Sequence, residues 1–308
     1  MAWSGVELEH VLSALGHLRP DHKTLRVVDG YPHIAYVRTE VRWLVLKKIT
    51  GQRKRDAWFE VLYESVQHLD WAATPYRNKS GRFTTPVGDS SIAIVLDKLP
   101  AGPARPTAAW WARSLGQLHD VECAEEQSRE SNYVNSRIAS AFEALRAVDG
   151  LLPQGISDAL TRGLLEVDSG LLVLNGKEVV VHADPNTGNV RGVPGRLFDF
   201  DRSGFAFREY DMQRLLWHLA AEDPEAVESL GGFWRVFKKC YEKQAGVEVD
   251  RTTLLFLYFI DIARAVSWLA LVSADSSRPD RARQATLLAQ LLSVVRHSVV
   301  EKTLRSVD

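Results

Sequence analysis

One short segment constrains this chain more than any other feature of its sequence. Three valines at residues 179–181 run into the polar group His182-Ala183-Asp184, and an amide follows at Asn189. Ten residues after that amide, a second apolar run leads into Asp199-Phe200-Asp201. An apolar run that ends in polar residues is typical of a buried strand that delivers side chains to a sheet edge. Two such strands in close succession predict acids and an amide side by side.

This set of side chains suits phosphoryl transfer. That reaction needs a carboxylate that accepts the proton of the attacking hydroxyl, and hard oxygen ligands for the Mg²⁺ that bridges the phosphates. The order His182-x-Asp184, then Asn189, then Asp199 follows the pattern of kinase catalytic segments. The structural alternative is an ordinary β-hairpin with a capped polar turn, in which the same residues carry no chemistry.

The segment resembles the signature of the aminoglycoside phosphotransferase and choline kinase family, H-G-D-x-x-x-x-N followed by I-D-F/W-D/E. The resemblance implies that Asp184 is the catalytic base and that Asn189 and Asp199 are the magnesium ligands. It also implies that Asp211 opens the next helix and braces the catalytic loop. The chain departs from the signature at Ala183, where the family usually has glycine. We expect this departure to bear on the substrate more than on the chemistry.

The same resemblance implies an α+β, bilobal protein-kinase-like fold with a small antiparallel-sheet N-lobe and a larger, mainly helical C-lobe. The length of 308 residues suits two lobes. Three strand-like runs lie between residues 24 and 48, and a stretch rich in proline and glycine at residues 100–106 marks a boundary. We therefore predict a nucleotide-covering N-lobe at 1–99 and a C-lobe at 100–308 with the catalytic loop and acceptor site.

Several N-lobe residues are expected to bind the nucleotide. The run Leu-Val-Leu-Lys ending at Lys47 resembles the strand whose lysine reaches the α- and β-phosphates. Lys48 is the alternative, because a shift of one residue in register would exchange their faces. The residues from Asp97 to Leu99 follow an apolar strand and resemble the hinge, where backbone groups meet the base.

Two parts of the predicted donor site stay open. The family pairs its strand lysine with a glutamate on the following helix, and the helix predicted at residues 56–69 offers Glu60 and Glu64. We prefer Glu60 and keep Glu64 as the alternative. The turn at residues 29–33 stands where the family has its phosphate-covering loop, but its low glycine content equally fits an ordinary hairpin turn.

The acceptor site is expected on an almost wholly apolar helix at residues 254–272. Asp261, Arg264 and Trp268 fall on one face of that helix. A buried charge must be paired or be used. The pattern therefore predicts either a structural Asp261–Arg264 ion pair beneath Trp268, or a wall of the acceptor pocket in which Asp261 binds the acceptor.

These motifs predict a small-molecule O-phosphotransferase with Mg²⁺ as cofactor. It would move the γ-phosphate of ATP, or of GTP, to a hydroxyl of an antibiotic-like acceptor of the aminoglycoside or nucleoside type. One alternative is a kinase of a primary metabolite of the choline, homoserine or methylthioribose type, and another is a catalytically weak nucleotide-binding pseudokinase. A protein kinase is disfavoured because the chain lacks a G-x-G-x-x-G loop and an A-P-E segment.

The composition narrows the class of protein further. A net charge of −1 gives no general attraction to nucleic acid or membrane. The two cysteines, Cys123 and Cys240, are far apart, which disfavours a disulfide framework or a zinc site and favours a reducing cytosol. The first ten residues carry acids where a signal peptide carries basic residues. We expect a cytoplasmic monomer or homodimer with no nucleic-acid or membrane partner.

Overall fold

The chain forms two compact units in a computed structural model. The described parts of Met1–Arg105, Glu122–Gln127 and Gly188–Asp201 belong to the first unit, and those of Pro106–Val121, Ser128–Thr187 and Arg202–Asp308 belong to the second. The structure describes residues 2–51, 55–100, 106–122, 133–147, 158, 161–162, 178–192, 194–222, 227–254, 257, 260–261, 263–265 and 267. Among the helices of these residues, none is long and apolar enough to span a membrane.

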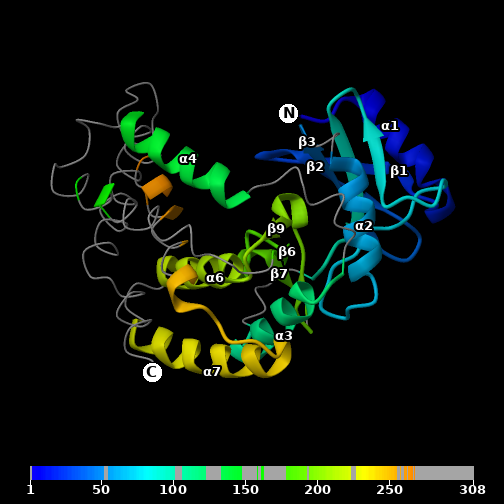
Figure 1. Ribbon diagram of the computed structural model, residues 1–308. Helices are drawn as coiled ribbons and strands as arrows, with labels where there is room; N and C mark the ends of the chain where they lie inside the picture. Colours follow the sequence, from blue (N-terminus) through cyan, green and yellow to red (C-terminus); the bar gives the residue numbers. More distant parts are fainter. Residues whose placement is uncertain are drawn as a thin grey trace. The chain divides into compact units, whose positions relative to one another are not determined.

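The first unit contains an antiparallel sheet of five strands in the order β1-β2-β3-β5-β4, of which Figure 1 labels β1 to β3. Its strands are β1 (Asp21–Val28), β2 (Tyr31–Arg38), β3 (Trp43–Thr50), β4 (Thr84–Val87) and β5 (Ser91–Asp97). The short hairpin of β7 (Val190–Arg191) and β8 (Arg196–Leu197) belongs to the same unit. Gly30 has φ 77° in the β1–β2 turn, a conformation that glycine adopts without steric cost.

Helix α1 (Gly5–Ala14) covers one face of the sheet (Figure 1). It begins at a capping box, in which the Ser4 hydroxyl accepts the Glu7 backbone N–H and the Glu7 carboxylate accepts the Ser4 backbone N–H. Its buried face, which includes Val11 and Leu12, packs in one hydrophobic cluster with the β3 residue Leu46. A short 3₁₀ turn (Gly16–Leu18) follows α1, and helix α2 (Asp56–Val66) packs beside β4.

The alternation of β3 separates its two lysines. Lys48 lies on the same face as Leu46, where its ammonium is 2.7 Å from Glu7 Oε1 and 3.2 Å from the Ala2 carbonyl oxygen. Successive side chains of a strand point to opposite faces, so Lys47 projects away from α1. The register therefore assigns Lys48 to the buried contact with the N-terminal helix, and leaves Lys47 for the other face.

We expect Glu7→Gln to lower the free energy of unfolding by about 2–3 kcal/mol. The Lys48 side chain is only 5% exposed, and removing one partner of a buried ion pair leaves an uncompensated charge. The hydrogen bond from Lys48 lowers the pKa of Glu7, so this stabilisation is present at neutral pH. It is lost as the pH falls through the folded-state pKa, below the ordinary value for glutamate. Urea unfolding at pH 7 and at low pH measures both effects.

Glu9→Gln is the matched control on the same helix. The Glu9 side chain is 66% exposed, and its ion-pair partner is His22 at 3.4 Å. An exposed pair contributes less than about 1 kcal/mol, so this variant should unfold almost like the wild type. Equal unfolding free energies for Glu7→Gln and Glu9→Gln would contradict the role given to the Lys48–Glu7 pair.

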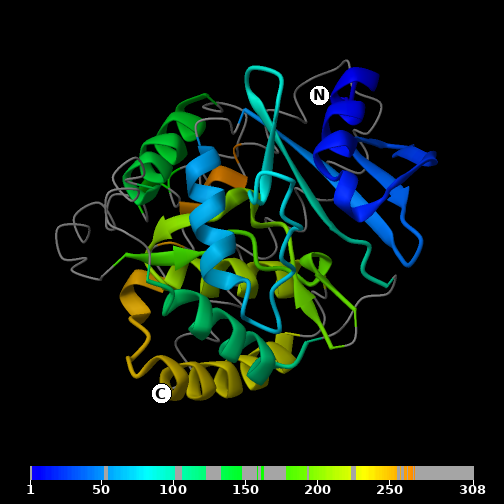
Figure 2. The same cartoon turned by 90° about the vertical axis from the view of Figure 1, so that its right-hand side faces the viewer.

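The second unit is mainly helical. Its long helices are α3 (Ala108–His119), α4 (Tyr133–Ala147), α6 (Glu209–Glu222) and α7 (Val227–Ala245), and its small sheet pairs β6 (Val179–Val181) with β9 (Gly204–Ala206). Helices α3 and α7 pack together in both views (Figures 1 and 2). A Cβ at Gly116 would lie 2.8 Å from Gln244 Cγ, so glycine permits this close approach.

Candidate functional site

Lys47 joins the two acids of the second apolar run in the first unit. Its Nζ lies 2.6 Å from Asp199 Oδ1 and 2.7 Å from Asp201 Oδ2. The lysine is held in the middle of the sheet, because β3 pairs with β2 at Ile34 and with β5 at Ile94. The structure therefore brings together a lysine and a candidate metal ligand that are 152 residues apart.

The electrostatics of this cluster favour a cation. Burial disfavours the charged form of Lys47, but Asp201 and Asp199 outweigh this effect and raise its pKa. Burial is also the main cause that raises the pKa of Asp201 to about 6, with the Asp199 charge adding to it and Lys47 opposing it. Asp201 Oδ1 is buried and has no hydrogen-bond partner among the residues that the structure describes. Two carboxylates around one ammonium leave excess negative charge, so the donor set fits a hard divalent cation.

Asn189 and Asp199 lie at the same end of the β7–β8 hairpin. Asn189 immediately precedes β7, Val190 pairs with Leu197 of β8, and the Phe198 N–H donates to the Asn189 carbonyl oxygen at 3.0 Å. In the described residues, no group of three or more histidines, cysteines or acids is arranged to hold a metal. Two protein oxygen ligands plus nucleotide phosphates are the usual arrangement for Mg²⁺.

Asp199 adopts a left-handed backbone conformation, with φ 69°. This region costs most L-residues about 1–2 kcal/mol, although aspartate is among the side chains that visit it most readily. Strained backbone of this kind clusters at active sites. The conformation therefore agrees with a functional role for the loop at Asp199.

The two glutamates proposed to pair with Lys47 have other partners. Glu60 Oε1 accepts the Thr84 backbone N–H at 2.8 Å, which ties α2 to the start of β4. Glu64 forms an ion pair with Arg77. In the described residues, the expected Lys47–Glu60 pair is therefore not formed: Lys47 contacts Asp199, and Glu60 contacts the Thr84 backbone.

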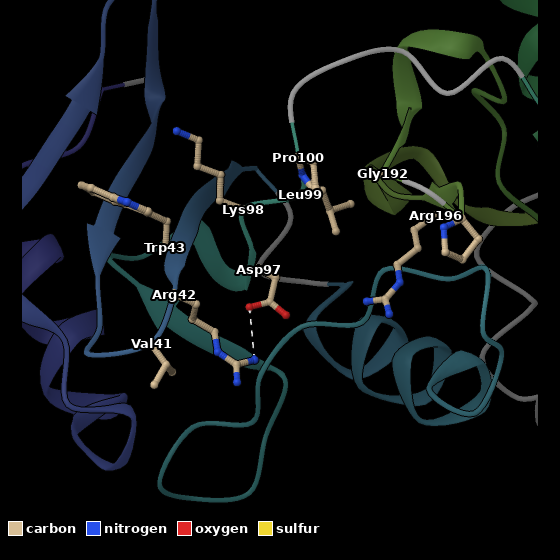
Figure 3. Close-up of a pocket in the computed structure, with 10 residues that line it drawn as sticks. Val41, Arg42, Trp43, Asp97, Lys98, Leu99, Pro100, Gly192 and Arg196 are labelled. Carbon is tan, nitrogen blue, oxygen red and sulfur yellow. Dashed lines mark hydrogen bonds and ion pairs between the residues drawn. The ribbon is translucent and has the colours of Figure 1, made fainter.

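The predicted hinge borders a cavity of about 420 Å³ (Figure 3). Asp97 and Leu99 line it together with Trp43, and the cavity wall is completed by Val41, Arg42, Lys98, Pro100, Gly192, Pro194 and Arg196. The Asp97 carboxylate accepts the Tyr76 hydroxyl at 2.8 Å and lies 3.5 Å from Arg42 Nη1. The side chain of Asp97 therefore already has partners within the protein. Its backbone is the group that could form hydrogen bonds with a nucleotide base.

Asp184 lies in a cationic setting in the second unit. Its Oδ1 is 3.1 Å from Arg214 Nη2, 3.2 Å from His218 Nε2 and 3.9 Å from Arg202 Nη1. Burial by itself would raise the pKa of Asp184. The hydrogen bond with His218 and the charges of Arg214, His218 and Arg202 outweigh burial and hold this pKa well below its usual range. Asp184 is therefore a carboxylate at neutral pH.

Asp211 braces the loop that carries Asp184, as the family resemblance implied. Its Oδ2 accepts the His182 backbone N–H at 2.8 Å, and its Oδ1 accepts the Ala183 backbone N–H at 2.7 Å. His119 Nε2 lies 3.2 Å from the same carboxylate, and His119 Nδ1 lies 2.6 Å from the Tyr241 hydroxyl. These contacts agree with the bracing role expected of Asp211, and they place His119 in the same buried hydrogen-bond network.

Asp211→Asn should lower the free energy of unfolding by about 2–4 kcal/mol. Both carboxylate oxygens accept backbone N–H groups, so an amide must direct its own N–H₂ at one of these donors and leave it unsatisfied in the interior. Thermal unfolding measures this loss. Asp120→Asn, at the exposed C-terminal cap of α3, makes the same isosteric change and should be nearly neutral. Equal melting temperatures for the two variants would contradict the bracing role.

The candidate acceptor residues are only partly described. Asp261 is 4% exposed, and its Oδ2 lies 2.6 Å from Gln213 Nε2 and 3.1 Å from Arg214 Nη1. Arg264 Nη1 is 3.7 Å from Asp261 Oδ1, so the predicted Asp261–Arg264 ion pair is present. Trp268 lies outside the described residues.

Sequence reasoning expected Asp211 on α6 but missed the two other residues that this helix contributes to the site, Arg214 and His218. Asp211, Arg214 and His218 stand at i, i+3 and i+7, which places them on one face of a helix. That spacing was visible in the sequence. The partners of Arg214 were not visible there, because Asp184 and Asp261 are 30 and 47 residues away from it and no local pattern connects positions so far apart.

Solved structures of low sequence identity share the fold. An amicoumacin kinase in complex with AMP-PNP, Ca²⁺ and Ami has a TM-score of 0.69 at 16% identity, over 96% of this chain and 94% of that one. An aminoglycoside phosphotransferase from Alicyclobacillus acidocaldarius has a TM-score of 0.66 at 15% identity, over 98% of each chain. A choline/ethanolamine kinase family protein from Mesorhizobium loti has a TM-score of 0.61 at 15% identity, also over 98% of each. The predicted α+β, protein-kinase-like fold is confirmed.

The sequence itself identifies the family. Comparison with curated proteins finds no match. The model of the phosphotransferase enzyme family matches residues 84–244, which is just over half of the chain and includes the segments with Asp184, Asn189 and Asp199. The expected phosphotransferase class is confirmed, and the chain belongs to the phosphotransferase enzyme family.

Proposed function

We propose that this protein transfers the γ-phosphate of ATP, or of GTP, to a hydroxyl group of a small antibiotic-like acceptor. The contact between Lys47 and Asp199 at 2.6 Å carries the proposal. It joins the lysine expected to bind phosphates to an acid expected to bind metal, although the two come from motifs far apart in the chain. The amicoumacin kinase solved with AMP-PNP and Ca²⁺ supports a nucleotide donor and a divalent cation.

The donor side of the reaction would be served by the first unit. Lys47 would bind the α- and β-phosphates, and Asn189 and Asp199 would hold Mg²⁺, which offsets phosphate charge when bound. The backbone between Asp97 and Leu99 would bind the base. A Lys47–Glu60 pair in the active enzyme would require Glu60 to exchange its contact at Thr84 for the lysine.

The acceptor side would be served by Asp184. Its low pKa keeps it ionised at neutral pH, so it would accept a hydrogen bond from the acceptor hydroxyl and then receive the proton. A strong base is not required, because a loose phosphoryl-transfer transition state demands little deprotonation of the nucleophile before bond formation. Asp184 would therefore act chiefly by orienting the hydroxyl.

The chemical class of the acceptor distinguishes the proposed antibiotic kinase from the alternative kinase of a primary metabolite. Structural neighbours include an amicoumacin kinase, a spectinomycin phosphotransferase and a choline/ethanolamine kinase family protein. We favour an antibiotic-like acceptor, with a primary metabolite of the choline, homoserine or methylthioribose type as the alternative. The division into lobes at 1–99 and 100–308, the cytoplasmic location and a monomeric or homodimeric state stay predictions.

An acceptor panel tests the proposal. The protein is incubated with Mg²⁺ and ATP, or GTP, and with aminoglycosides, nucleoside antibiotics, choline, homoserine or methylthioribose, and each acceptor is examined for the mass gain of one phosphate. Phosphorylation of an antibiotic is expected. Phosphorylation of a primary metabolite alone would support the alternative kinase, and Mg²⁺-dependent ATP binding without any turnover would indicate a pseudokinase.

A further inference from the structure

Arg214 connects the half-buried carboxylate of Asp184 to the buried carboxylate of Asp261 in the second unit. Its Nη2 is 3.1 Å from Asp184 Oδ1, and its Nη1 is 3.1 Å from Asp261 Oδ2. The side chain is 14% exposed and stands on α6, one turn after the Asp211 that braces the Asp184 loop. A guanidinium presents its donors in a rigid plane, so fixing one end of the fork also fixes the other.

Asp261 is itself held in place by groups of the protein. Gln213 Nε2 lies 2.6 Å from Asp261 Oδ2, the oxygen that also faces Arg214, and Arg264 lies 3.7 Å from Oδ1. With 4% of its surface exposed, this carboxylate offers little area to an acceptor. Its charge balances the buried guanidinium, whose pKa is raised chiefly because Asp261 outweighs the effect of burial.

We propose that Arg214 is a positioning residue for Asp184, and that Asp261 influences phosphoryl transfer only by holding Arg214. The inference rests on the proposed role of Asp184 as the group that receives the acceptor hydroxyl. Arg214 keeps the carboxylate ionised and in one orientation. Nε2 of His218, one turn further along α6, lies 3.1 Å from Arg214 Nη2 and 3.2 Å from Asp184 Oδ1, so it either accepts from the guanidinium or donates to the carboxylate. Asp261 is then no acceptor ligand, which favours the structural alternative of the two roles that the sequence left open for it.

The charge of Asp184 is tested in the free enzyme, without any acceptor. Carbon-13 NMR follows the aspartate carboxyl signals with pH, and Asp184→Asn assigns the relevant signal. In the wild type this carboxyl should stay ionised down to the pH at which the protein unfolds. In Arg214→Met its titration should move up into the measurable range, because one of its positive partners is lost. Arg214→Lys should restore most of the wild-type behaviour.

The orientation of Asp184 is tested with Mg·ATP and water as the acceptor, by release of inorganic phosphate. Arg214→Met should lower kcat by roughly 10–100-fold and leave the KM for ATP unchanged, because misplacement of a catalytic group costs rate. Arg214→Lys should recover part of kcat. The control is Arg235→Met, an exposed position on α7, which should leave the NMR titration and kcat as in the wild type.

A double-mutant cycle tests whether Asp261 affects kcat only through its contact with Arg214. Asp261→Asn should lower kcat less than Arg214→Met, and the double variant should be no slower than Arg214→Met alone, because both changes act through one contact. Additive losses would overturn the claim that Asp261 acts through Arg214. A lowered melting temperature in both Arg214 variants, with unchanged kcat and carboxyl titration, would overturn the positioning role. A wild-type rate in Asp184→Asn would instead reject the proposed function of Asp184, so the two failures are distinguishable.

Discussion

Asp184→Asn should lower kcat by roughly 10²–10⁴-fold while the fold and nucleotide binding stay intact. The side chain keeps its shape, and its remaining oxygen still accepts a hydrogen bond from Arg214, which also retains Asp261 as an ion-pair partner. What is lost is the negative oxygen that orients the acceptor hydroxyl and takes its proton. Steady-state kinetics with the acceptor found by the panel measures the loss, and circular dichroism and ATP titration check the fold and donor binding.

Asp89→Asn is the matched control for this change. Asp89 is exposed in the turn between β4 and β5, and the same isosteric replacement there should leave kcat unchanged. If Asp184→Asn turned over at a rate close to that of Asp89→Asn, Asp184 would not be the group that receives the proton.

Asp199→Ala should abolish Mg²⁺-dependent nucleotide binding. It removes a charged oxygen ligand and also one of the two carboxylates that surround Lys47. Asn189→Ala should weaken binding less, because it removes a neutral ligand. Titration calorimetry with ATP in the presence of Mg²⁺ and of a chelator measures the metal-dependent part of the affinity.

The backbone at position 199 requires a second variant. Alanine is strained at φ 69°, whereas asparagine tolerates this region well, so Asp199→Asn removes the charge without adding backbone strain. Both variants should lose the metal-dependent affinity. Calorimetric titrations in which Mg·ATP binds Asp199→Asn as tightly as the wild type would contradict the assignment of this loop to the metal.

The catalytic segment was predictable because its residues are close in sequence. The spacing of Asp184, Asn189 and Asp199 identified the motif, and the two-residue period of β3 limited the phosphate ligand to Lys47 or Lys48. The structure separates those two lysines by pairing Lys48 with Glu7. Choosing between the two lysines required the contact of Lys48 with the N-terminal helix, and the sequence pattern of a strand does not reveal such a contact.

Contacts between distant residues were beyond the sequence patterns. The helix pattern offered Glu60 as a partner for Lys47, but tertiary packing places its carboxylate at the Thr84 backbone. Ala183 shows the reverse case, in which the structure explains a sequence pattern. Its φ of 66° lies in the region that favours glycine, and its N–H is tied to Asp211. The glycine that the family usually has at this position adopts the left-handed conformation without steric cost, whereas Ala183 adopts it here under strain.

Phosphorus-31 NMR tests the central claim most directly. The protein is incubated with Mg·ATP and the panel acceptor, and the γ-phosphate signal is followed in the wild type and in Asp184→Asn. We predict that the wild type converts the γ-phosphate into an equal amount of a phosphomonoester on the acceptor, and that Asp184→Asn does so at least about 10²-fold more slowly. If the wild type binds Mg·ATP but its γ-phosphate stays in ATP, or appears only as inorganic phosphate with every acceptor, the protein is not the phosphotransferase proposed.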